Sequence, residues 1–200
     1  MTKRLVIFGG SFDPPGIHHV LIAFYLSAHY DDVVVLPCGQ RPDQKLADGR
    51  HRAMMVESAF NGIHGVRVDD TDVRKPTFER MCETIERLRP QGDLTIFVGD
   101  DLLTSADGRM PIRDSWKDGA RLWQKEKFAI LPRLHSATRL TDIPPRSTVY
   151  GYMVTGSSTK IRECIRDGIG FHHLVPRTVA DHIERHGLYL DRQQQVRLVS

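Results

Sequence analysis

The N-terminal segment constrains the fold of this chain more than any other part of the sequence. An apolar run, 5–8, is followed by the small residues Gly9, Gly10 and Ser11, and helical spacing begins at Ile17. Small residues let the backbone approach a ligand closely, and the first amides of a helix offer hydrogen-bond donors to an anion. Ordinary turns between a strand and a helix use the same residue types. The segment therefore predicts a strand, a turn and a helix, with a phosphate site in the turn as the functional alternative.

Two histidines at the start of this helix bear on that alternative. His18 and His19 carry imidazoles, which can neutralise phosphoryl oxygens or donate hydrogen bonds to them. In the expected strand, turn and helix, both imidazoles would lie close to the small residues of the turn. They favour the phosphate site over an ordinary turn.

Length and composition limit the kind of protein this can be. The chain has 200 residues, 40% of them apolar, which suits one globular domain. We expect this domain to span residues 1–190 and to be followed by a polar, glutamine-rich tail, 191–200. Because 28 basic residues nearly balance 25 acidic ones, the net charge of +3 gives no reason to expect a nucleic-acid partner.

The cysteines and the N-terminus indicate a cytoplasmic protein. Cys38, Cys82 and Cys164 are odd in number, far apart and without the spacing of metal ligands, which predicts reduced thiols, no disulfide and no zinc. The apolar run after the N-terminus is too short for a signal peptide, and no apolar segment reaches membrane-spanning length. We therefore expect no membrane partner and no metal held by the protein itself.

Short apolar runs that alternate with helical spacing predict the fold class. The runs show little internal alternation, as in strands buried on both faces of a parallel sheet. The expected strands are 5–8, 33–36, 95–98, 128–131 and, more weakly, 148–154; the expected helices are 20–29, 51–60, 78–88 and 122–127. This order predicts an α/β protein with a doubly wound, Rossmann-like, mostly parallel sheet and helices on both faces.

In such a sheet, ligands bind beyond the carboxyl ends of the strands. Four polar segments follow expected strands, namely 9–19, 37–45, 99–103 and Arg133. Topology therefore brings these segments together around one crevice.

A second candidate for anion binding opens a helix in the last third of the chain. Its residues are Ser157, Ser158, Thr159 and Arg162. The hydroxyls could cap the helix and do nothing more. Alternatively, hydroxyls, helix amides and the guanidinium form a second phosphate cradle opposite the first turn. Two such cradles suit a triphosphate.

The segment 179–189 is expected to form a closing helix, with Gly187 just past its end. His182 and His186 are four residues apart and could share a metal ion. The sequence pattern offers no third ligand, so a solvated helix face is the preferred interpretation.

The first turn and the second segment together resemble the nucleotidyltransferase superfamily. Its first motif is Gly-x-[Ser/Thr]-Phe-Asp-Pro-x-His-x-Gly-His and its second is Ser-Ser-Thr-x-Ile-Arg, to which 9–19 and 157–162 correspond in the same order. Within the superfamily, the chain is similar to bacterial nicotinate mononucleotide adenylyltransferases. The likeness extends to segments 37–45, 51–54, 99–101, 128–133 and 183–189 and to Trp116.

The resemblance implies that a nucleotidyl group passes from a nucleoside triphosphate to the phosphate of a small acceptor, with release of pyrophosphate. ATP and nicotinate mononucleotide, the pair used in NAD biosynthesis, are the default substrates. Such enzymes act mainly by positioning and charge neutralisation. Mg²⁺ is expected as the partner of the triphosphate, with few protein ligands.

The resemblance also assigns roles to individual residues. The residues that it implies make catalytic contacts with phosphates are His18, His19, Lys45 and Arg162. The residues that it implies bind the nucleotide are Gly9, Gly10, Ser11, Phe12, Gly99, Asp101, Arg133, Ser157, Ser158 and Thr159. Among them, Asp101 would contact the ribose hydroxyls. Acceptor binding falls to Thr77, Phe78 and Trp116, although Trp116 could instead be a core tryptophan.

The first motif departs from the family pattern at two positions. The family's first histidine falls at Gly16 and its glycine falls at His18, so that His-x-Gly-His has become Gly-Ile-His-His. Three outcomes fit this exchange: His18 reaches the phosphates by another path, the nucleotide is not ATP, or catalysis is lost.

A second departure concerns the acceptor. In the segment 76–82, only the first three residues match the family's acceptor pattern; Glu79 and Arg80 are either solvated helix charges, the preferred interpretation, or readers of a different acceptor. The segment 104–114 is rich in small and charged residues, which predicts a mobile loop beside the crevice.

Two functional alternatives follow from these departures, and a third has another origin. The first is a nucleotidyltransferase that uses another nucleotide, such as CTP, or another phosphorylated acceptor. The second is a nucleotide-binding sensor without catalysis. The third is an RNA-related role, suggested only by a distant likeness of the first motif to that of class I aminoacyl-tRNA synthetases. It is disfavoured, because we expect neither an anticodon-binding extension nor a strong basic face. The sequence leaves the oligomeric state open, a homo-oligomer included.

Overall fold

The fold is built on a six-stranded sheet in which neighbouring strands are parallel. The computed structural model describes residues 2–99, 102–104, 109–132 and 143–191. Along the sheet the strands follow the order β3-β2-β1-β4-β5-β6. They are β1 (Arg4–Gly10), β2 (Asp32–Pro37), β3 (Val66–Val68), β4 (Asp93–Gly99), β5 (Lys127–Leu131) and β6 (Ser147–Val149). The order reverses between β1 and β4, which confirms the doubly wound α/β fold.

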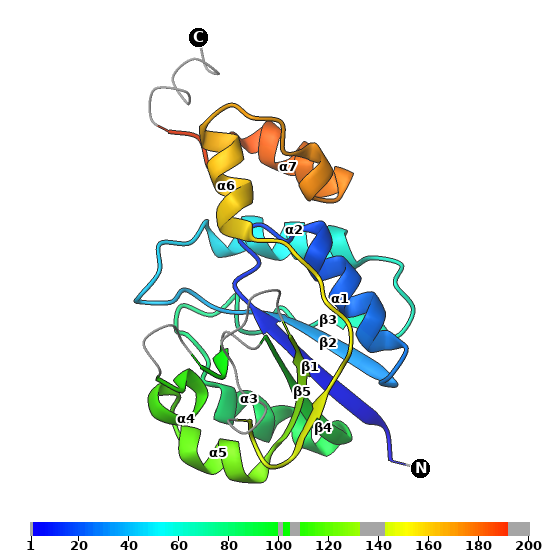
Figure 1. Cartoon of the computed structure of the whole chain (residues 1–200). Helices are drawn as coiled ribbons and strands as arrows, with labels where there is room; N and C mark the ends of the chain where they lie inside the picture. Colours follow the sequence, from blue (N-terminus) through cyan, green and yellow to red (C-terminus); the bar gives the residue numbers. More distant parts are fainter. Residues whose placement is uncertain (1, 100–101, 105–108, 133–142, 192–200) are drawn as a thin grey trace.

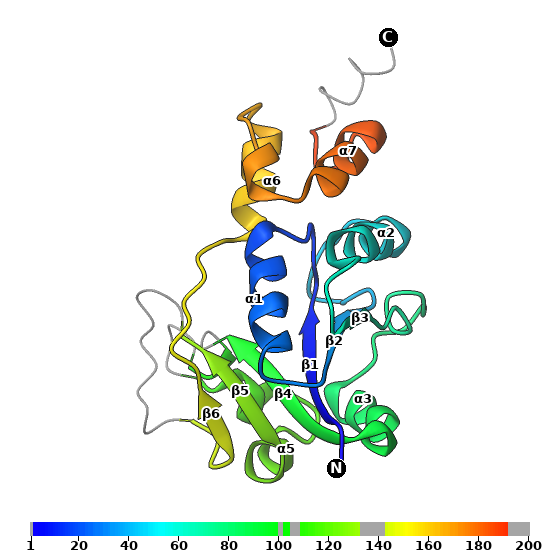
Figure 2. The ribbon, with the colours of Figure 1, turned by 90° about the vertical axis from the view of Figure 1, so that its right-hand side faces the viewer.

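Helices cover both faces of this sheet (Figure 1). They are α1 (Ile17–Ser27), α2 (Gly49–Phe60), α3 (Met81–Leu88), α4 (Pro111–Ser115), α5 (Gly119–Lys125), α6 (Ser158–Arg166) and α7 (Arg177–His186). Figure 2 shows α6 and α7 stacked beyond the carboxyl end of β1, at the opposite end of the molecule from the N-terminus. Of the described helices, none combines the length and the apolar character needed to cross a membrane.

The central strand β1 shows why the apolar runs have no alternation. Val6 and Phe8 belong to the core cluster that contains residues of α1, α2, α6 and α7, whereas Leu5 and Ile7 belong to the cluster with α3, α4 and α5. All four side chains are buried. Both faces of the strand are therefore covered, and successive side chains fill two separate cores.

The element boundaries differ from the expected ones in several places. The expected strand 148–154 leaves the sheet after Val149, where the pairing with β5 ends, so β6 has only three residues. The expected helix 78–88 begins at Met81, because Arg80 has an extended backbone and caps the helix. The expected helix 122–127 ends at Lys125, and β5 begins two residues later.

Two elements were not expected. The strand β3 has three residues, too few for a periodic signal, and takes its place by pairing with β2. The segment 104–114 contains the start of α4, so its last residues are helical, while 105–108 lie outside the described residues. The three cysteines are buried free thiols, as expected for Cys38, Cys82 and Cys164.

Candidate functional site

Two adjoining cavities open where the sheet order reverses, and they share Ser11, His18, His19 and Gly156. The first, of ≈ 490 Å³, has a mostly polar wall. That wall consists of the shared residues with Gln44, Lys45, Leu46, Ser157, Ser158, Thr159 and Arg162. The second, of ≈ 270 Å³, is lined by the shared residues with Phe8, Gly9, Gly10, Phe12, Ile22, Phe97, Val98, Gly99, Leu102, Leu131, Pro132 and Val154.

The two cavities bring together every described residue that the sequence assigned to phosphate or nucleotide. They come from β1, α1, the segment after β2, β4 and the start of α6. Asp101 and Arg133, which were assigned to the same site, lie outside the described residues. The crevice predicted from topology is thus present, with its polar part on the side of α6.

Hydrogen bonds join the start of α6 to the first turn. Ser158 Oγ donates to the Pro14 carbonyl over 2.8 Å, and Arg162 Nη1 donates to the Asp13 carbonyl over 2.6 Å. Arg162 Nη2 also donates to Thr159 Oγ1 over 3.2 Å. Ser157 caps α6, because its Oγ accepts a bond of 3.4 Å from a backbone N–H of the helix. The hydroxyls of this segment therefore cap the helix and also wall the polar cavity.

Buried polar groups form hydrogen bonds to the turn that follows β1, which contains Ser11 and Asp13. The Arg52 side chain is fully buried and donates to the carbonyls of Ser11 at 3.0 Å and Cys38 at 2.7 Å. Asp13 Oδ1 accepts a hydrogen bond of 2.8 Å from the hydroxyl of Tyr189. Burial and the Asp13 carboxylate raise the pKa of Tyr189, so this hydroxyl remains protonated and donates.

Arg52 is a residue whose role the sequence reasoning missed. A charged side chain that interrupts the buried face of a helix was the available signal. Its carbonyl partners come from the turns after β1 and β2, so it couples the positions of both segments.

His19 is oriented by the backbone of its own helix. The Gly16 N–H donates to Nδ1 of His19 over 3.0 Å, which satisfies the N-cap amide at the start of α1. Because Nδ1 accepts this bond, the ring proton lies on Nε2. His19 Nε2 is consequently the ring atom that can donate to an anion in the cavity.

His18 occupies the space next to Gly16, where the family pattern has a histidine. A Cβ added to Gly16 would lie 2.6 Å from both Nδ1 and Cε1 of His18, and one added to Gly156 would lie 2.3 Å from Cγ of His18. The His18 ring thus fits between two glycine backbones, and side chains at either position would collide with it. The polar cavity therefore contains the His18 imidazole, although this chain has glycine at position 16, where the family pattern has its first histidine.

The residues assigned to the acceptor lie apart from the two cavities. The side chain of Phe78 is half-buried, with the guanidinium carbons of Arg41 and Arg80 at 5.8 Å and 5.6 Å from its ring centre. Thr77 is exposed, and Trp116 packs partly buried against the core beneath α3 and α5. None of the three lines either cavity in the part of the chain that the structure describes.

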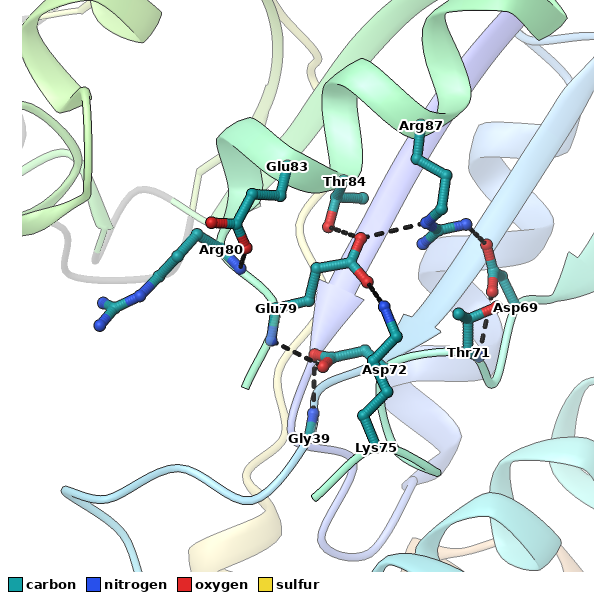
Figure 3. A network of polar contacts seen from close by, with 10 residues as sticks. All are labelled: Gly39, Asp69, Thr71, Asp72, Lys75, Glu79, Arg80, Glu83, Thr84 and Arg87. Carbon is teal, nitrogen blue, oxygen red and sulfur yellow. Dashed lines mark hydrogen bonds and ion pairs between the residues drawn. The ribbon is translucent and has the colours of Figure 1, made fainter. Parts of the chain in front are cut away.

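Glu79 is the centre of a buried ion-pair network, so its interpretation as a solvated helix charge is wrong (Figure 3). One carboxylate oxygen accepts hydrogen bonds from Arg87 Nε at 3.0 Å and Thr84 Oγ1 at 3.1 Å, and the other pairs with Lys75. Arg87 Nη1 also donates to Asp69 over 2.6 Å. Arg80 is exposed, as the solvated interpretation expected.

The network fixes the segment that carries Thr77 and Phe78. Asp72 accepts 2.7 Å bonds from the backbone N–H groups of Gly39 and Glu79, which joins this segment to the turn after β2. Burial raises the pKa of Asp72, and the Glu79 carboxylate adds to this effect.

Arg87 keeps two buried carboxylates charged. Burial by itself disfavours their ionised forms, but hydrogen bonds from Thr71 and Arg87 to Asp69, and from Lys75 and Arg87 to Glu79, outweigh it. The pKa of Asp69 and that of Glu79 therefore both lie below their ordinary values.

A group of three histidines lies between α2 and α7, away from the cavities. His51 joins His182 and His186, so the expected solvated face is wrong for His182, which is buried. Burial and the neighbouring His186 and His51 rings lower the pKa of His182. The signal for this group was absent from the sequence because the third member comes from a different helix.

Comparison with known proteins adds three findings. The cytidylyltransferase-like family model matches residues 7–164. The chain is 31% identical to the probable nicotinate-nucleotide adenylyltransferase of Gemmatimonas aurantiaca over 93% of this chain and 92% of that protein. It is also 31% identical to a protein of the same name from Tropheryma whipplei strain Twist, over 90% of this chain and 97% of that protein.

A solved structure is similar in fold. Plasmodium falciparum nicotinic acid mononucleotide adenylyltransferase complexed with NaAD matches with a TM-score of 0.74 and 22% identity, over 94% of this chain and 97% of that one. The same enzyme complexed with APC matches with a TM-score of 0.72 and 21% identity, over 94% of this chain and 97% of that one. At these identities the likeness concerns the fold.

Proposed function

The chain belongs to the cytidylyltransferase-like family of nucleotidyltransferases, and from this premise we propose that it is a nicotinate-nucleotide adenylyltransferase. A phosphate oxygen of nicotinate mononucleotide attacks the α-phosphorus of ATP. The bond from that phosphorus to the bridging oxygen breaks, pyrophosphate leaves, and nicotinate adenine dinucleotide forms. The observation that carries the proposal is the polar cavity in which two segments, 140 residues or more apart, are joined by hydrogen bonds.

The polar cavity suits the triphosphate. His18, His19, Lys45 and Arg162 line it, and no carboxylate does so among the described residues. The N-terminus of α6 adds backbone donors and the positive end of a helix dipole. Cationic and N–H donors from the two segments stabilise the charge that shifts onto pyrophosphate as the bond breaks, and this is the main catalytic device of the proposal.

Two of the four catalytic side chains, His19 and Arg162, are held by contacts that leave donors suited to this task. His19 is oriented by the Gly16 N–H and can donate from Nε2. Arg162 has five N–H donors, and its contacts with Asp13 and Thr159 fix the plane of the guanidinium. Such fixed donors need little reorganisation when the transition state forms.

The second cavity suits the nucleoside. Gly9 and Gly10 at the end of β1 and Gly99 at the end of β4 line this cavity. Apolar residues, among them Phe8, Ile22 and Phe97, supply much of the remaining wall and suit a purine ring. The roles of Asp101 at the ribose and Arg133 at the nucleotide remain predictions for residues outside the described part.

The acceptor is proposed to bind beside Phe78 and Thr77. Nicotinate mononucleotide carries a carboxylate and a phosphate, and two cations flank the Phe78 ring: Arg80, and Arg41, which is ion-paired with Asp43. This pair of arginines supports an anionic acceptor. The core contacts of Trp116 favour its structural role over a contact with the acceptor ring.

Mg²⁺ is proposed to enter with the triphosphate. The donors lining the polar cavity are imidazoles, cations, hydroxyls and one amide, a set poorly suited to hold a hard cation without the substrate. Phosphate oxygens and water then supply its ligands, and the ion neutralises part of the triphosphate charge.

The test is a matrix of nucleotides and acceptors. Purified protein with Mg²⁺ is incubated with ATP, CTP, GTP or UTP against nicotinate mononucleotide, nicotinamide mononucleotide or a pool of phosphorylated metabolites. The proposal expects pyrophosphate and the dinucleotide from ATP with nicotinate mononucleotide. Products from another pair alone would reassign the substrates, and nucleotide binding without any product would favour a sensor.

A further inference from the structure

Three histidine side chains meet where α7 packs on α2. His182 and His186 are four residues apart on α7, so they share one face of that helix. His51 reaches the same face from the start of α2. Nδ1 of His51 lies 3.0 Å from Nε2 of His182, and one ring nitrogen of each histidine lies within 4.8 Å of the others.

We propose that these three imidazoles bind one divalent transition-metal ion, with Zn²⁺ as the expected occupant. Zinc binds histidine nitrogen at about 2.0–2.1 Å in tetrahedral geometry, which separates the ligand nitrogens by about 3.4 Å. The present spacing brackets this value, with one nitrogen pair of His51 and His182 at 3.0 Å and three ring nitrogens within 4.8 Å of one another. Imidazole donors favour zinc, copper and nickel, whereas magnesium and calcium require oxygen.

The surroundings suit an ion that enters from solvent. His182 is buried, His51 is half-buried and His186 is exposed, so one side of the group is dry and the other is open. Water can then occupy the fourth coordination position. The neighbouring cation Arg185 opposes a bound positive charge and limits the affinity.

The site lies on rigid elements. Val179, Ala180 and Ile183 of α7 are buried in the same core cluster as Met55 and Val56 of α2. The backbones that carry the ligands are therefore fixed before an ion arrives, which lowers the entropic cost of binding.

An ion at this position would tie α7 to the helix that supports the first turn. Arg52 follows His51 in the chain and holds the Ser11 carbonyl. Tyr189, just after α7, holds Asp13. Metal binding is thus expected to stabilise the folded chain, because the unfolded chain holds no preformed site.

The test uses the untagged full-length chain after treatment with a chelator, and it needs neither nucleotide nor acceptor. Co²⁺ is titrated while visible absorption is recorded, Zn²⁺ is added in competition, and the thermal midpoint is measured with and without Zn²⁺. The variants are His186→Ala and His51→Asn. The matched control is His173→Ala, which removes an exposed histidine outside the group.

Wild type and His173→Ala should each bind one Co²⁺ with the intense absorption of a tetrahedral site, lose it to Zn²⁺, and melt at a higher temperature with Zn²⁺. Both ligand variants should lose these responses. His186 is exposed, so its replacement leaves the core intact, and circular dichroism checks the fold. The proposal is overturned if wild type shows no saturable Co²⁺ binding, or if either ligand variant binds as well as the control.

Discussion

Replacing Gly16 by alanine tests whether the His18 imidazole is part of the catalytic site. The backbone of Gly16 has φ −100° and ψ 170°, which alanine adopts without strain. The added Cβ would lie 2.6 Å from two atoms of the His18 ring and 2.9 Å from Cδ1 of Ile161, whereas ordinary contacts begin at 3.4 Å. The ring must therefore move by about 0.8 Å. On its other side the ring already packs against the backbone of Gly156, which limits where it can move.

A displacement of this size matters more for catalysis than for folding. Misplacing a catalytic group by about 1 Å can lower the rate about 100-fold, equivalent to roughly 2.7 kcal/mol. We expect such a loss in kcat for Gly16→Ala. Mild overpacking costs about 1 kcal/mol in stability, so the thermal midpoint should fall by only about 2–4 °C.

The assay is steady-state pyrophosphate release, with thermal denaturation in parallel. Gly151→Ala is the control, because a Cβ there meets no atom within 4 Å. His18→Ala alone should also lose about 100-fold in kcat, and the double variant should lose no more, since the two changes remove the same contact. Activity of Gly16→Ala within threefold of wild type, or multiplicative losses in the double variant, would refute the reasoning.

Other predictions concern the remaining contacts of the site and the ion-pair network. His19→Ala and Arg162→Ala should each lower kcat by about 100- to 1,000-fold while the thermal midpoint changes far less; unchanged turnover in both variants would show that the site is wrong. Arg87→Met should destabilise the fold by about 2–3 kcal/mol at pH 7, because it removes charge-assisted hydrogen bonds from Asp69 and Glu79. Since the folded state lowers the pKa of both carboxyls, their contribution is full above the ordinary carboxyl pKa near 4 and is lost as the pH falls below it. Urea unfolding of wild type and Arg87→Met should therefore differ less at pH 3.5 than at pH 7, and an equal difference would contradict the assignment.

The parts of the site that the sequence predicted carry their signal locally. The small residues of the first turn and the hydroxyls that open α6 are recognisable from a few neighbouring positions. Buried parallel strands are likewise recognisable from continuous apolar runs, and their carboxyl ends must meet at one edge. Local pattern and topology were therefore enough to place the polar side of the crevice.

The parts that were missed depend on contacts between distant segments. Glu79 looks like an ordinary surface charge until Arg87 and Asp69 are placed beside it. His51 and His182 are 131 positions apart, and only the packing of α7 on α2 joins them. The fit of His18 between two glycines follows the same rule, because Gly156 belongs to a segment far along the chain.

The most direct test of the central claim follows the phosphorus atoms of ATP through the reaction. Protein, Mg²⁺ and nicotinate mononucleotide are mixed with ATP labelled at the α-phosphorus or, in parallel, at the γ-phosphorus. Adenylyl transfer predicts that the α-label enters the dinucleotide and the γ-label appears in pyrophosphate, with both transfers strongly reduced in Arg162→Ala. Release of the γ-label as orthophosphate, or absence of the α-label from any dinucleotide, would contradict the account.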